Sequence, residues 1–393
     1  MSILIEINST TPVPVHGYLA IDSLFDGEAH GGLRISGDVS AGLLAAAART
    51  KTLKYGFVRL PVGGAKAGIT APSGLSADDR RALLHAFGRA LRPYLATKMY
   101  VPGEDMGTSR ADIDDFMQAA GLPPIPRSLP HGQSGYYTGI GLCACALALA
   151  HNAGNRTSPL TVSIEGFGNV GSAAAMEFLR REARVVAVST SEGAVYNPSG
   201  LDIALMVEHR RQVGNHVVNE SGLGERIQPE DLGALGENVF APCAIMHSID
   251  AERARALTAR IVCPGANVPY TREAEHVMRQ RGIIYVPDFV ANCGGVLGAS
   301  IARAGIADRR VQEIVRGRID TETRMLLIAA REHALPLQQV AEQVALQRFE
   351  HEKAAYERHS PSQQLFRTVV GLHRRGLIPR ALVARAAGRY FSR

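Results

Sequence analysis

Thr161-Val162-Ser163-Ile164-Glu165-Gly166-Phe167-Gly168-Asn169-Val170-Gly171 is the stretch that decides the fold. It predicts a short apolar strand that runs into Gly-x-Gly-x-x-Gly and then an alanine-rich helix from Ser172 to about Arg181. The glycines permit a tight turn, close approach of a pyrophosphate and close packing of the helix, whose N-terminus favours phosphate. A second strand, residues 184–189, follows at the spacing of a βαβ unit. The stretch therefore predicts dinucleotide binding, in preference to a glycine-rich turn of another α/β unit.

The length and composition favour a soluble protein with more than one domain. The chain has 393 residues, of which 46% are hydrophobic and 20% charged, enough for two sizeable cores. The net charge is +6, and many of the extra arginines lie in residues 374–393. Because apolar residues alternate with them, we expect a packed amphipathic helix with a solvated face. We predict no nucleic-acid partner for this tail.

Cysteine usage and the N-terminus bear on the compartment. The five cysteines form no Cys-x-x-Cys pair, which favours buried free thiols in a reducing compartment and no metal site. The N-terminus lacks a basic segment followed by an apolar core, so no signal peptide is predicted. The longest apolar run, near residues 140–150, is too short to span a bilayer. We expect a cytoplasmic protein with no membrane segment.

In the N-terminal part, helices and glycine-rich turns alternate. We expect a helix over residues 41–52, then a strand over 57–62 that ends in a glycine-rich turn, residues 63–68, holding Lys66. Ser76 caps a helix that stops at Pro93, residues 100–108 form a loop, and Ser109 caps the next helix. The prolines of residues 123–130 predict a linker, and residues 138–151 predict a helix rich in small residues.

In the C-terminal part, strands end at Gly166, Thr190, Pro242, Pro264 and Pro287. Ligands of an open parallel sheet lie outside the carboxyl ends of its strands. The polar residues just past these ends are candidate contacts, although Asn and Asp are also common turn residues: Thr190, Ser191, Cys243, Asn267, Asp288 and Asn292. After about Ile301 the pattern is helical, with a break near residues 360–362.

Taken together, the motifs resemble the glutamate/leucine/phenylalanine/valine dehydrogenase family. The resemblance covers most of the chain and rests on seven motifs in the family's order. They are Gly31-Gly32-Leu33-Arg34, Pro61 to Gly68, Glu104 to Thr108, Thr138 to Gly141, Glu165 to Gly171, Gly265 to Pro269 and Pro287 to Gly295.

The resemblance implies an α/β fold of two domains with C-terminal helices. Residues 1–130 would form an α/β domain for substrate and oligomer contacts, and residues 131–310 a Rossmann-type doubly wound domain that binds NAD or NADP. Residues 311–393 would be helices that return to the first domain. The implied reaction is oxidative deamination of an L-amino acid to a 2-oxo acid by a homo-oligomer, in a cleft that closes.

The resemblance also assigns roles to residues. Lys66 would bind the α-carboxylate and Asp105 would handle protons on the amine, although a solvated loop lysine and a turn-capping aspartate are the simpler interpretations from sequence alone. Thr138 and Asn267 match positions near the nicotinamide. The expected cofactor contacts are Gly166, Phe167, Gly168, Asn169, Val170, Gly171, Thr190, Ser191, Thr138, Cys243, Asn267 and Asn292. We expect these glycines and Lys66, Asp105, Thr138, Asn267 and Asn292 to line one cleft.

Two departures from the family pattern concern specificity. Where an acidic residue would accept from the ribose 2′-hydroxyl, the chain has Ser189-Thr190-Ser191, which predicts that NADP is tolerated. His30 stands where glutamate-specific members carry a lysine, and Ala299 lies near where they use a serine. A buried carboxylate without a cation is costly, so we expect an apolar substrate rather than glutamate, unless His30 is only a polar loop residue.

A third departure concerns catalysis. The family carries a second lysine shortly after the first, as the general base that activates water, but residues 67–80 contain none; Ser73, Gly74 or Leu75 stands there. Arg80 cannot replace it because guanidinium stays protonated, whereas Asp105 or His85 would cover the loss only in part. The sequence therefore predicts weak or absent deamination with cofactor binding retained. A different imine or keto-acid reductase and a non-catalytic nucleotide-binding subunit are the alternatives.

Overall fold

The computed structural model describes residues 2–10, 14–72, 74–125, 133–154, 159–358 and 368. The chain divides into two compact units, which are described separately here. The first comprises residues 1–127 and 343–359, and the second comprises residues 128–342 and 360–393. Part of the predicted proline-rich linker, from Pro126 to Pro130, lies outside the described residues, as do the predicted break at residues 360–362 and the arginine-rich tail.

The first unit is built on a five-stranded sheet in the order β1-β2-β4-β3-β5. Its strands are β1 (Ile3–Ser9), β2 (Val15–Ile21), β3 (Ala29–Ser36), β4 (Gly63–Thr70) and β5 (Val101–Glu104). Strand β2 pairs antiparallel with β1 and with β4, whereas β3 pairs parallel with β4 and with β5. The central strands β4 and β3 therefore carry side chains that face both layers of helices.

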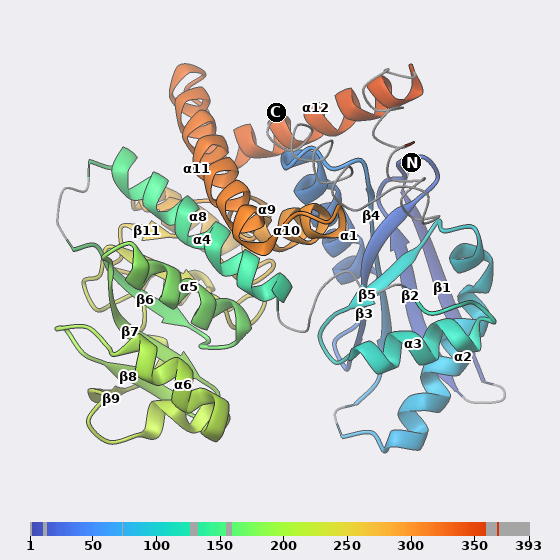
Figure 1. Ribbon diagram of the computed structural model, residues 1–393, viewed down its shortest axis with the longest axis horizontal. Coiled ribbons are helices and arrows are strands. Elements are labelled where there is room, and N and C mark those ends of the chain that lie inside the picture. Colours follow the sequence, from blue (N-terminus) through green and yellow to red (C-terminus); the bar gives the residue numbers. More distant parts are fainter. Residues whose placement is uncertain are drawn as a thin grey trace. The chain divides into compact units, whose positions relative to one another are not determined.

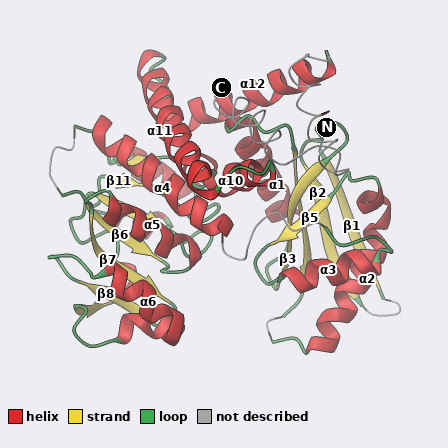
Figure 2. Cartoon of the chain, in the orientation of Figure 1, coloured by secondary structure: helices red, strands yellow, loops and turns green. Residues whose placement is uncertain are grey.

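Helices cover both faces of this sheet (Figures 1 and 2). Helices α2 (Ala77–Ala96) and α3 (Arg110–Ala119) bury Phe87 and Phe116 against a core that includes Leu33 and Ile69. Helix α1 (Ala41–Phe57) lies on the other face, where Leu44 and Ala48 pack with Ala20 and Val39. The end of α12 (Leu337–Glu357) belongs to this unit, and Arg348 donates to the Phe57 carbonyl at 2.9 Å.

Three expectations for this unit were wrong. Residues 57–62 are not a strand, because α1 continues to Phe57 and the glycine-rich segment 63–70 is itself strand β4. The glycines of β4 allow α1 to approach the strand. The segment forms a strand because it pairs with β3, and this long-range pairing cannot be predicted from the local sequence pattern. Residues 101–104 form strand β5 instead of a loop, for the same non-local reason. Helix α2 continues through Pro93 to Ala96, whereas the caps at Ser76 and Ser109 are confirmed.

The second unit contains a seven-stranded sheet in the order β12-β11-β10-β6-β7-β8-β9. Its strands are β6 (Thr161–Glu165), β7 (Arg184–Thr190), β8 (Gly193–Tyr196), β9 (Glu225–Ile227), β10 (Val239–Pro242), β11 (Ile261–Val262) and β12 (Ile284–Tyr285). The five strands from β12 to β7 run parallel, and β8 and β9 add an antiparallel edge. This is the doubly wound arrangement that the sequence predicted.

Helices lie on both faces of this second sheet. Helices α7 (Ala251–Ala256) and α8 (Arg272–Gln280) bury Ala254 and Met278 with Phe240 and Val262. On the other face, α4 (Gln133–Asn152) packs against α5 (Asn169–Arg180) and α11 (Asp308–Glu332) (Figure 1). The remaining helices are α6 (Ile203–Val213), α9 (Asp288–Ala291) and α10 (Gly294–Arg303), with short 3-10 turns at Gly214–Asn219 and Pro229–Asp231. Helix α5 starts inside the glycine motif, three residues earlier than expected.

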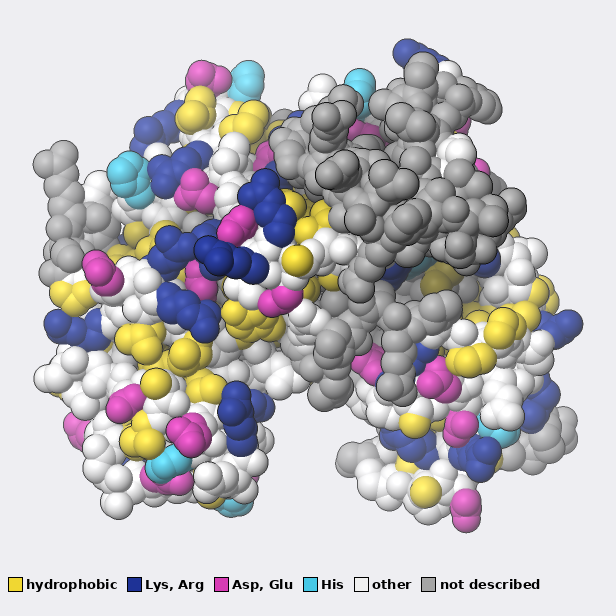
Figure 3. Space-filling view, viewed as in Figure 1, with side chains coloured by type: hydrophobic (Ala, Val, Ile, Leu, Met, Phe, Trp, Pro, Cys, Tyr) yellow, Lys and Arg dark blue, Asp and Glu magenta, His cyan; other side chains and the backbone are white. Residues whose placement is uncertain are grey.

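A buried carboxylate joins α5 to α11. The Glu177 side chain is 1% exposed, and Arg316 donates to it at 2.7 Å, with Arg180 and Arg181 at 3.5 and 3.4 Å. Burial acts to raise the pKa of Glu177, but Arg316 and Arg181 hold it below its usual value. Figure 3 shows basic side chains, all of them arginines in this part of the chain, gathered on the face that carries α4, α5 and α11. The ion pairs of Glu177 therefore hold α5 against α11.

Within the described residues, none of the helices is long and apolar enough to cross a bilayer.

The close approach of α1 to β4 generates a stability prediction. A Cβ added at Gly64 would lie 2.4 Å from the Thr52 amide nitrogen and 2.6 Å from the Ala48 carbonyl oxygen. We expect Gly64→Ala to lower the free energy of unfolding of the first unit by about 1–3 kcal/mol, because backbone must move. Urea unfolding followed by circular dichroism measures the change.

The matched control is Gly42→Ala on α1, the helix that packs against Gly64. Gly42 is exposed, and a Cβ added there would meet nothing within 4 Å. We expect this variant to be as stable as the unmodified protein or up to about 1 kcal/mol more stable, since alanine favours helix. Equal stability of the Gly64→Ala protein and the unmodified protein would contradict the proposed packing constraint.

Candidate active site

The glycine loop of the second unit has the geometry that a dinucleotide requires. Gly166 adopts a φ of +86°, and a Cβ on Gly171 would lie 2.1 Å from the Gly166 carbonyl oxygen. By contrast, a Cβ on Gly168 would meet nothing within 4 Å, so this side of the loop is open to a ligand. Gly168 is the N-cap of α5 and, being glycine, has no side chain to bond to the first amides of the helix. These amides and the start of the helix fit a pyrophosphate.

The carboxyl end of β7 carries hydroxyl groups. The Gly166 amide donates to Ser189 Oγ at 3.1 Å, which ties the glycine loop to this strand. Thr190 Oγ1 donates to the Asn215 carbonyl at 2.7 Å, and Asn215 Nδ2 donates to Ser191 Oγ at 3.0 Å. Both predicted residues, Thr190 and Ser191, thus lie at the strand end where an adenosine ribose is recognised in such sheets.

Glu192, two positions after Thr190, is already engaged. His216 Nδ1 lies 3.6 Å from Glu192 Oε2, and Arg226 donates to the Glu192 carbonyl at 3.3 Å. Arg226 and His216 bring positive or ionisable groups to the position where the sequence lacks an aspartate. The sequence analysis did not single out either residue, because they follow Thr190 by more than 20 positions.

The other predicted cofactor residues gather near β10 and α9. The Cys243 amide donates to the Glu165 carbonyl at 2.7 Å, and a Cβ on Gly265 would lie 2.6 Å from Cys243 Sγ. Asn292 Nδ2 donates to Asn267 Oδ1 at 3.1 Å and to the Ala266 carbonyl at 3.0 Å. Asn292 Oδ1 is buried and has no hydrogen-bond partner among the residues that the structure describes, so it can accept from a ligand.

Thr138 and Ala299 are placed on helices of the same unit. Thr138 Oγ1 donates to the Ser134 carbonyl at 2.9 Å within α4, and it would lie 2.5 Å from a Cβ on Gly295 at the start of α10. Ala299 is on α10 and is half-buried. The close contact at Gly295 explains why a glycine pair opens this helix.

In the first unit, a buried ion cluster joins strands β3 and β4 to the loop that follows β5. Lys66 Nζ on β4 lies 2.6 Å from Asp105 Oδ2, and Arg34 Nε on β3 lies 3.2 Å from the same oxygen. The side chains of Lys66 and Arg34 are each 5% exposed and that of Asp105 is 16% exposed. Such a cluster withdraws two cations and one carboxylate from water, which is unfavourable unless they pair.

Burial and neighbouring charge set the protonation of this cluster. Burial lowers the pKa of Lys66 to about 8, although Asp105 acts in the opposite direction. Burial acts to raise the pKa of Asp105, but Lys66 and Arg34 hold it below the usual value. Lys66 can therefore lose its proton in a range where an exposed lysine stays charged, while Asp105 remains a carboxylate.

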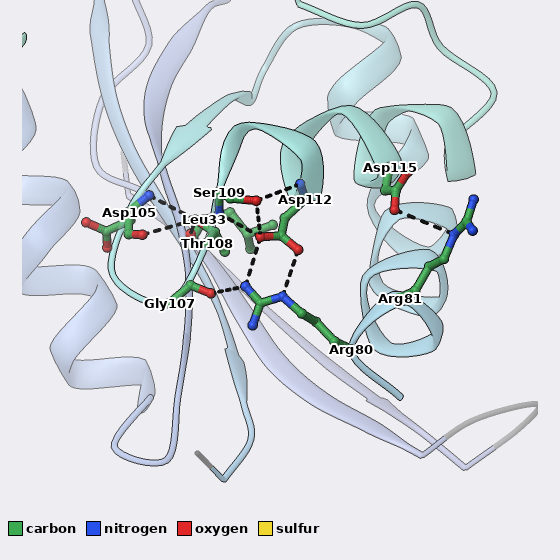
Figure 4. A network of polar contacts seen from close by, with 9 residues as sticks. All are labelled: Leu33, Arg80, Arg81, Asp105, Gly107, Thr108, Ser109, Asp112 and Asp115. Atoms are coloured by element: carbon green, nitrogen blue, oxygen red, sulfur yellow. Dashed lines mark hydrogen bonds and ion pairs between the residues drawn. The ribbon is translucent and has the colours of Figure 1, made fainter. Parts of the chain in front are cut away.

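A hydrogen-bonded loop positions Asp105 (Figure 4). The Asp105 amide donates to Thr108 Oγ1 at 2.9 Å, and this hydroxyl donates to the Leu33 carbonyl at 2.7 Å. Gly107 has a φ of +76° and lies so close to β3 that a Cβ would be 2.0 Å from the Ile35 carbonyl oxygen. Arg80 donates to the Gly107 carbonyl and forms an ion pair with Asp112.

His30 lies on the same sheet face as this cluster. In the β3–β4 register His30 pairs with Gly64 and Arg34 pairs with Gly68. Both side chains therefore project from the sheet face on which α1 packs. His30 Nε2 is 3.7 Å from Glu28, which lowers the pKa of Glu28. His30 therefore shares a sheet face with Lys66 and Arg34, and its role in substrate binding stays a prediction.

Sequence reasoning missed Arg34 and Tyr100. Arg34 is the second cation that contacts Asp105. It lies four residues after His30 on β3, and this even spacing, which puts both side chains on one face of the strand, could have indicated it. Within the described part of the chain the buried Tyr100 hydroxyl has no hydrogen-bond partner, and burial and then Asp105 raise its pKa. His85, considered as a substitute base, is on α2, which packs on the opposite face of the sheet from α1.

The two groups of residues belong to different units, and the prediction that they line one cleft stays a prediction. In the part of the chain that the structure describes, no group of three or more His, Cys, Asp or Glu side chains is placed to hold a metal ion.

A glycine loop on a doubly wound sheet and a separate unit with a buried lysine–aspartate pair define a dinucleotide-dependent dehydrogenase. The chain belongs to the glutamate/leucine/phenylalanine/valine dehydrogenase family. The model of that family matches residues 132–356, and that of its dimerisation domain matches residues 3–120. The family and fold predictions are confirmed, and with them the class of oxidoreductase that acts on CH–NH2 donors with NAD or NADP.

Curated relatives and solved structures agree with this assignment. The glutamate dehydrogenase of Thermotoga maritima is 32% identical over 296 residues, which cover 71% of this chain and 70% of that protein. The NADP-specific glutamate dehydrogenase A1 of Halobacterium salinarum is 30% identical over 297 residues, 72% of this chain and 71% of that protein.

Among solved structures, the hetero-hexameric glutamate dehydrogenase from Thermus thermophilus in its Leu-bound form has a TM-score of 0.74 at 26% identity. The match covers 90% of this chain and 88% of that one. The L-tryptophan dehydrogenase from Nostoc punctiforme has a TM-score of 0.64 at 22% identity, with 89% and 96% covered, and shows likeness of fold alone.

The lowered pKa of Lys66 predicts a pH dependence of carboxylate binding. If a 2-oxo acid binds through protonated Lys66, its affinity should be constant below pH 8 and fall about tenfold per pH unit above it, because Lys66 loses its proton near pH 8. Calorimetric titration with a 2-oxo acid between pH 6.5 and 9.5 measures this.

The matched variant is Asp105→Asn. Asp105 raises the pKa of Lys66, so its removal should move the fall in affinity to lower pH. An affinity that stays constant to pH 9.5 in the unmodified protein would show that Lys66 does not hold the carboxylate.

Proposed function

We propose that the protein interconverts an L-amino acid with an apolar side chain and its 2-oxo acid, with NAD or NADP as hydride carrier. The observation that carries the proposal is the buried Lys66–Asp105 pair at 2.6 Å. A cation of lowered pKa beside a permanent carboxylate suits a substrate that has a carboxylate and an amine on one carbon. The family match supports the reaction class.

In this proposal each residue has one task. Lys66 binds the α-carboxylate, with Arg34 keeping Asp105 ionised, and Asp105 accepts a proton from the substrate ammonium. The glycine loop, Thr138, Cys243, Asn267 and Asn292 hold the dinucleotide, and the bound nicotinamide supplies the hydride acceptor. The open side of Gly168 and the unpaired Asn292 Oδ1 support this fit.

The substrate side chain is proposed to be apolar. His30 occupies the position of the glutamate-binding lysine, and it is paired with Glu28, which offsets any positive charge on its ring. A glutamate γ-carboxylate here would lack a strong cation, which costs several kcal/mol on burial. The curated relatives are named glutamate dehydrogenases, so this proposal separates the chain from them.

The cofactor is proposed to be NADP as readily as NAD. Thr190 and Ser191 replace the acidic residue, and Arg226 and His216 lie beside Glu192 at the same strand end. A 2′-phosphate would meet hydroxyls and a guanidinium instead of a repelling carboxylate. We also propose a homo-oligomer, supported by the match to the dimerisation domain, and a reducing, cytoplasmic setting, supported by five free cysteines.

The alternative proposal is an impaired or redirected enzyme. The position of the family's second lysine is taken by Ser73, Gly74 or Leu75, and Leu75 packs against the core under α2. Loss of a general base costs about 10² to 10⁴-fold in rate. In this alternative the chain binds nucleotide and reduces a different imine or keto acid, or serves as a non-catalytic subunit.

Turnover over a panel of substrates decides between these proposals. We expect NAD(P)H formation with apolar or aromatic L-amino acids and at least tenfold lower kcat/KM with glutamate, and the reverse reaction with the matching 2-oxo acids and ammonia. Absorbance at the nicotinamide band measures both directions. Efficient glutamate turnover with inert apolar amino acids would contradict the proposed substrate class.

A substitution at the end of β7 tests cofactor recognition. Thr190→Asp places a carboxylate where a 2′-phosphate is proposed to lie, so NADPH should bind at least tenfold more weakly while NADH binds equally or better. Fluorescence titration of both cofactors measures this, and Thr190→Asn is the neutral control of the same shape. Much tighter NADH binding by the unmodified protein would contradict NADP tolerance.

A further inference from the structure

The loop that carries Asp105 is held along strand β3. The Ile35 amide donates to the Met106 carbonyl at 3.1 Å, and the Thr108 hydroxyl donates to the Leu33 carbonyl at 2.7 Å. A further bond inside the loop, from the Thr108 amide to the Asp105 carbonyl at 3.0 Å, closes a turn. The bonds to β3 place the loop on the strand, and they come from one side of the loop.

Helix α2 contacts this loop from a second element. Arg80 donates to the Gly107 carbonyl, and the same guanidinium binds the two carboxylate oxygens of Asp112 at 2.7 and 2.8 Å (Figure 4). Asp112 is the acidic member of the capping box that Ser109 opens at the start of α3. A planar guanidinium holds its donors in a rigid fork, so these three bonds fix the loop to α2 and α3 together.

The Arg80–Asp112 pair keeps its charges across the pH range of an enzyme assay. Burial acts to raise the pKa of Asp112, but Arg80 and Ser109 lower it to about 2. The guanidinium of Arg80 stays protonated throughout this range. Lys66, by contrast, has a pKa that burial lowers to about 8. A change of protonation near pH 8 therefore belongs to Lys66 and not to Arg80 or Asp112.

Arg81, the next residue on α2, makes a different contact. Its Nε lies 3.5 Å from Asp115 Oδ2, and these two side chains are 60% and 35% exposed, against 31% and 11% for Arg80 and Asp112. Figure 4 shows the Arg81–Asp115 pair pointing away from the Gly107 turn. A single exposed ion pair contributes little to stability, because water screens it. Arg81 is therefore a matched control for Arg80 on the same turn of α2.

We propose that Arg80 is a positioning residue for the buried ion pair of the first unit. By holding the Gly107 carbonyl and Asp112 together, Arg80 keeps the Asp105 carboxylate where Lys66 Nζ meets it at 2.6 Å. Ion-pair energy and hydrogen-bond strength both fall as the atoms separate, so a looser loop weakens the Lys66–Asp105 pair. The effect on rate rests on the proposed amino-acid dehydrogenase function, whereas the effect on the Lys66 amine does not.

Nuclear magnetic resonance of the lysine side chains measures this pair without turnover. The chain has five lysines, so protein labelled with ¹³C at lysine Cε gives few signals, and Lys66→Met identifies the signal of Lys66 by its loss. Titration from about pH 6 to about pH 10 gives the midpoint of the Lys66 amine. We expect Arg80→Met to move this midpoint to lower pH, as Asp105→Asn does but by less, because a displaced Asp105 raises the pKa of Lys66 less.

The direction of the shift separates positioning from loss of charge. Burial, Lys51 and Arg34 lower the pKa of Lys66, whereas Asp105 raises it. Arg80 carries a positive charge, so its removal alone would raise the pKa of Lys66. A midpoint at lower pH therefore reports a weaker contact with Asp105. A midpoint that does not move, or that moves to higher pH, would overturn the proposal.

Two further variants test whether Arg80 acts through Asp105. Arg81→Met removes a cation from the same turn of α2 and should leave the midpoint of Lys66 unchanged. Adding Arg80→Met to the Asp105→Asn protein should cause no further shift to lower pH, since the carboxylate that Arg80 positions is gone. An equal shift in both backgrounds, or the same shift in Arg81→Met, would show that Arg80 does not position Asp105.

A conservative variant serves if circular dichroism shows that Arg80→Met does not fold. Arg80→Lys keeps a positive charge beside Asp112, but one ammonium nitrogen cannot reproduce the fork that reaches both Asp112 oxygens and the Gly107 carbonyl. We expect the midpoint of Lys66 to move in the same direction by a smaller amount. In that case, a folded Arg80→Lys protein with the midpoint of the unmodified protein would overturn the proposal.

Turnover measures the consequence for catalysis. We expect Arg80→Met to lower kcat of deamination by about ten- to a hundredfold, because a misplacement of about 1 Å costs about 10²-fold. Binding of NAD(P)H should stay unchanged, since the glycine loop belongs to the second unit. Arg81→Met should keep the kcat of the unmodified protein. Equal kcat values for Arg80→Met and Arg81→Met would overturn the role of Arg80 in catalysis.

The two measurements distinguish this inference from the proposed function. If the unmodified protein turns over no amino acid, the proposed function fails, and the midpoint of Lys66 still decides whether Arg80 positions Asp105. If the unmodified protein is active and Arg80→Met changes neither the midpoint nor kcat, only the role of Arg80 is overturned.

Discussion

The burial of a positive charge at Lys66 is the constraint on which the first unit depends. A lysine removed from water in the middle of a sheet is stable only beside a carboxylate, and that carboxylate must come from elsewhere in the chain. Asp105 meets this need at 2.6 Å, 39 positions later. The loop that carries Asp105 is fastened to β3 by Thr108 and Gly107, and Arg34 completes the charge balance. The ionisation of Asp105 thus depends on one buried amine, and the loop that carries Asp105 is held where it can pair with that amine.

In both units, glycines allow backbone segments to approach each other closely because they have no side chain. Gly64 lets α1 contact β4 above the buried charges, and Gly171 lets α5 return against the strand end at Gly166. In the second unit the loop stays open beside Gly168, where an added Cβ would meet nothing within 4 Å among the described residues. Since a single added methyl group would meet backbone atoms, neither contact can relax by a change of rotamer.

The composition of cations links structure to chemistry. Arginine fixes structure here, as in the three arginines that hold Glu177 and in Arg34 on Asp105. Lysine is concentrated in the segment from α1 to β4, where burial has already lowered the pKa of one amine to about 8. The division is physically sensible, because guanidinium gives permanent, multidentate charge whereas an amine can exchange a proton.

The sequence by itself determined the features that depend on neighbouring residues. The βα turn at Gly166–Gly171, the caps at Ser76 and Ser109 and the family motifs are all encoded within a few positions, so they could be predicted. The extent of β4 and β5 could not, because their pairing with β3 is made by residues far away in the chain. The grouping of Arg34, Lys66 and Asp105 on one sheet face was decided only by tertiary structure. Register across three strands and the packing of α1 set that grouping, and no local pattern records either.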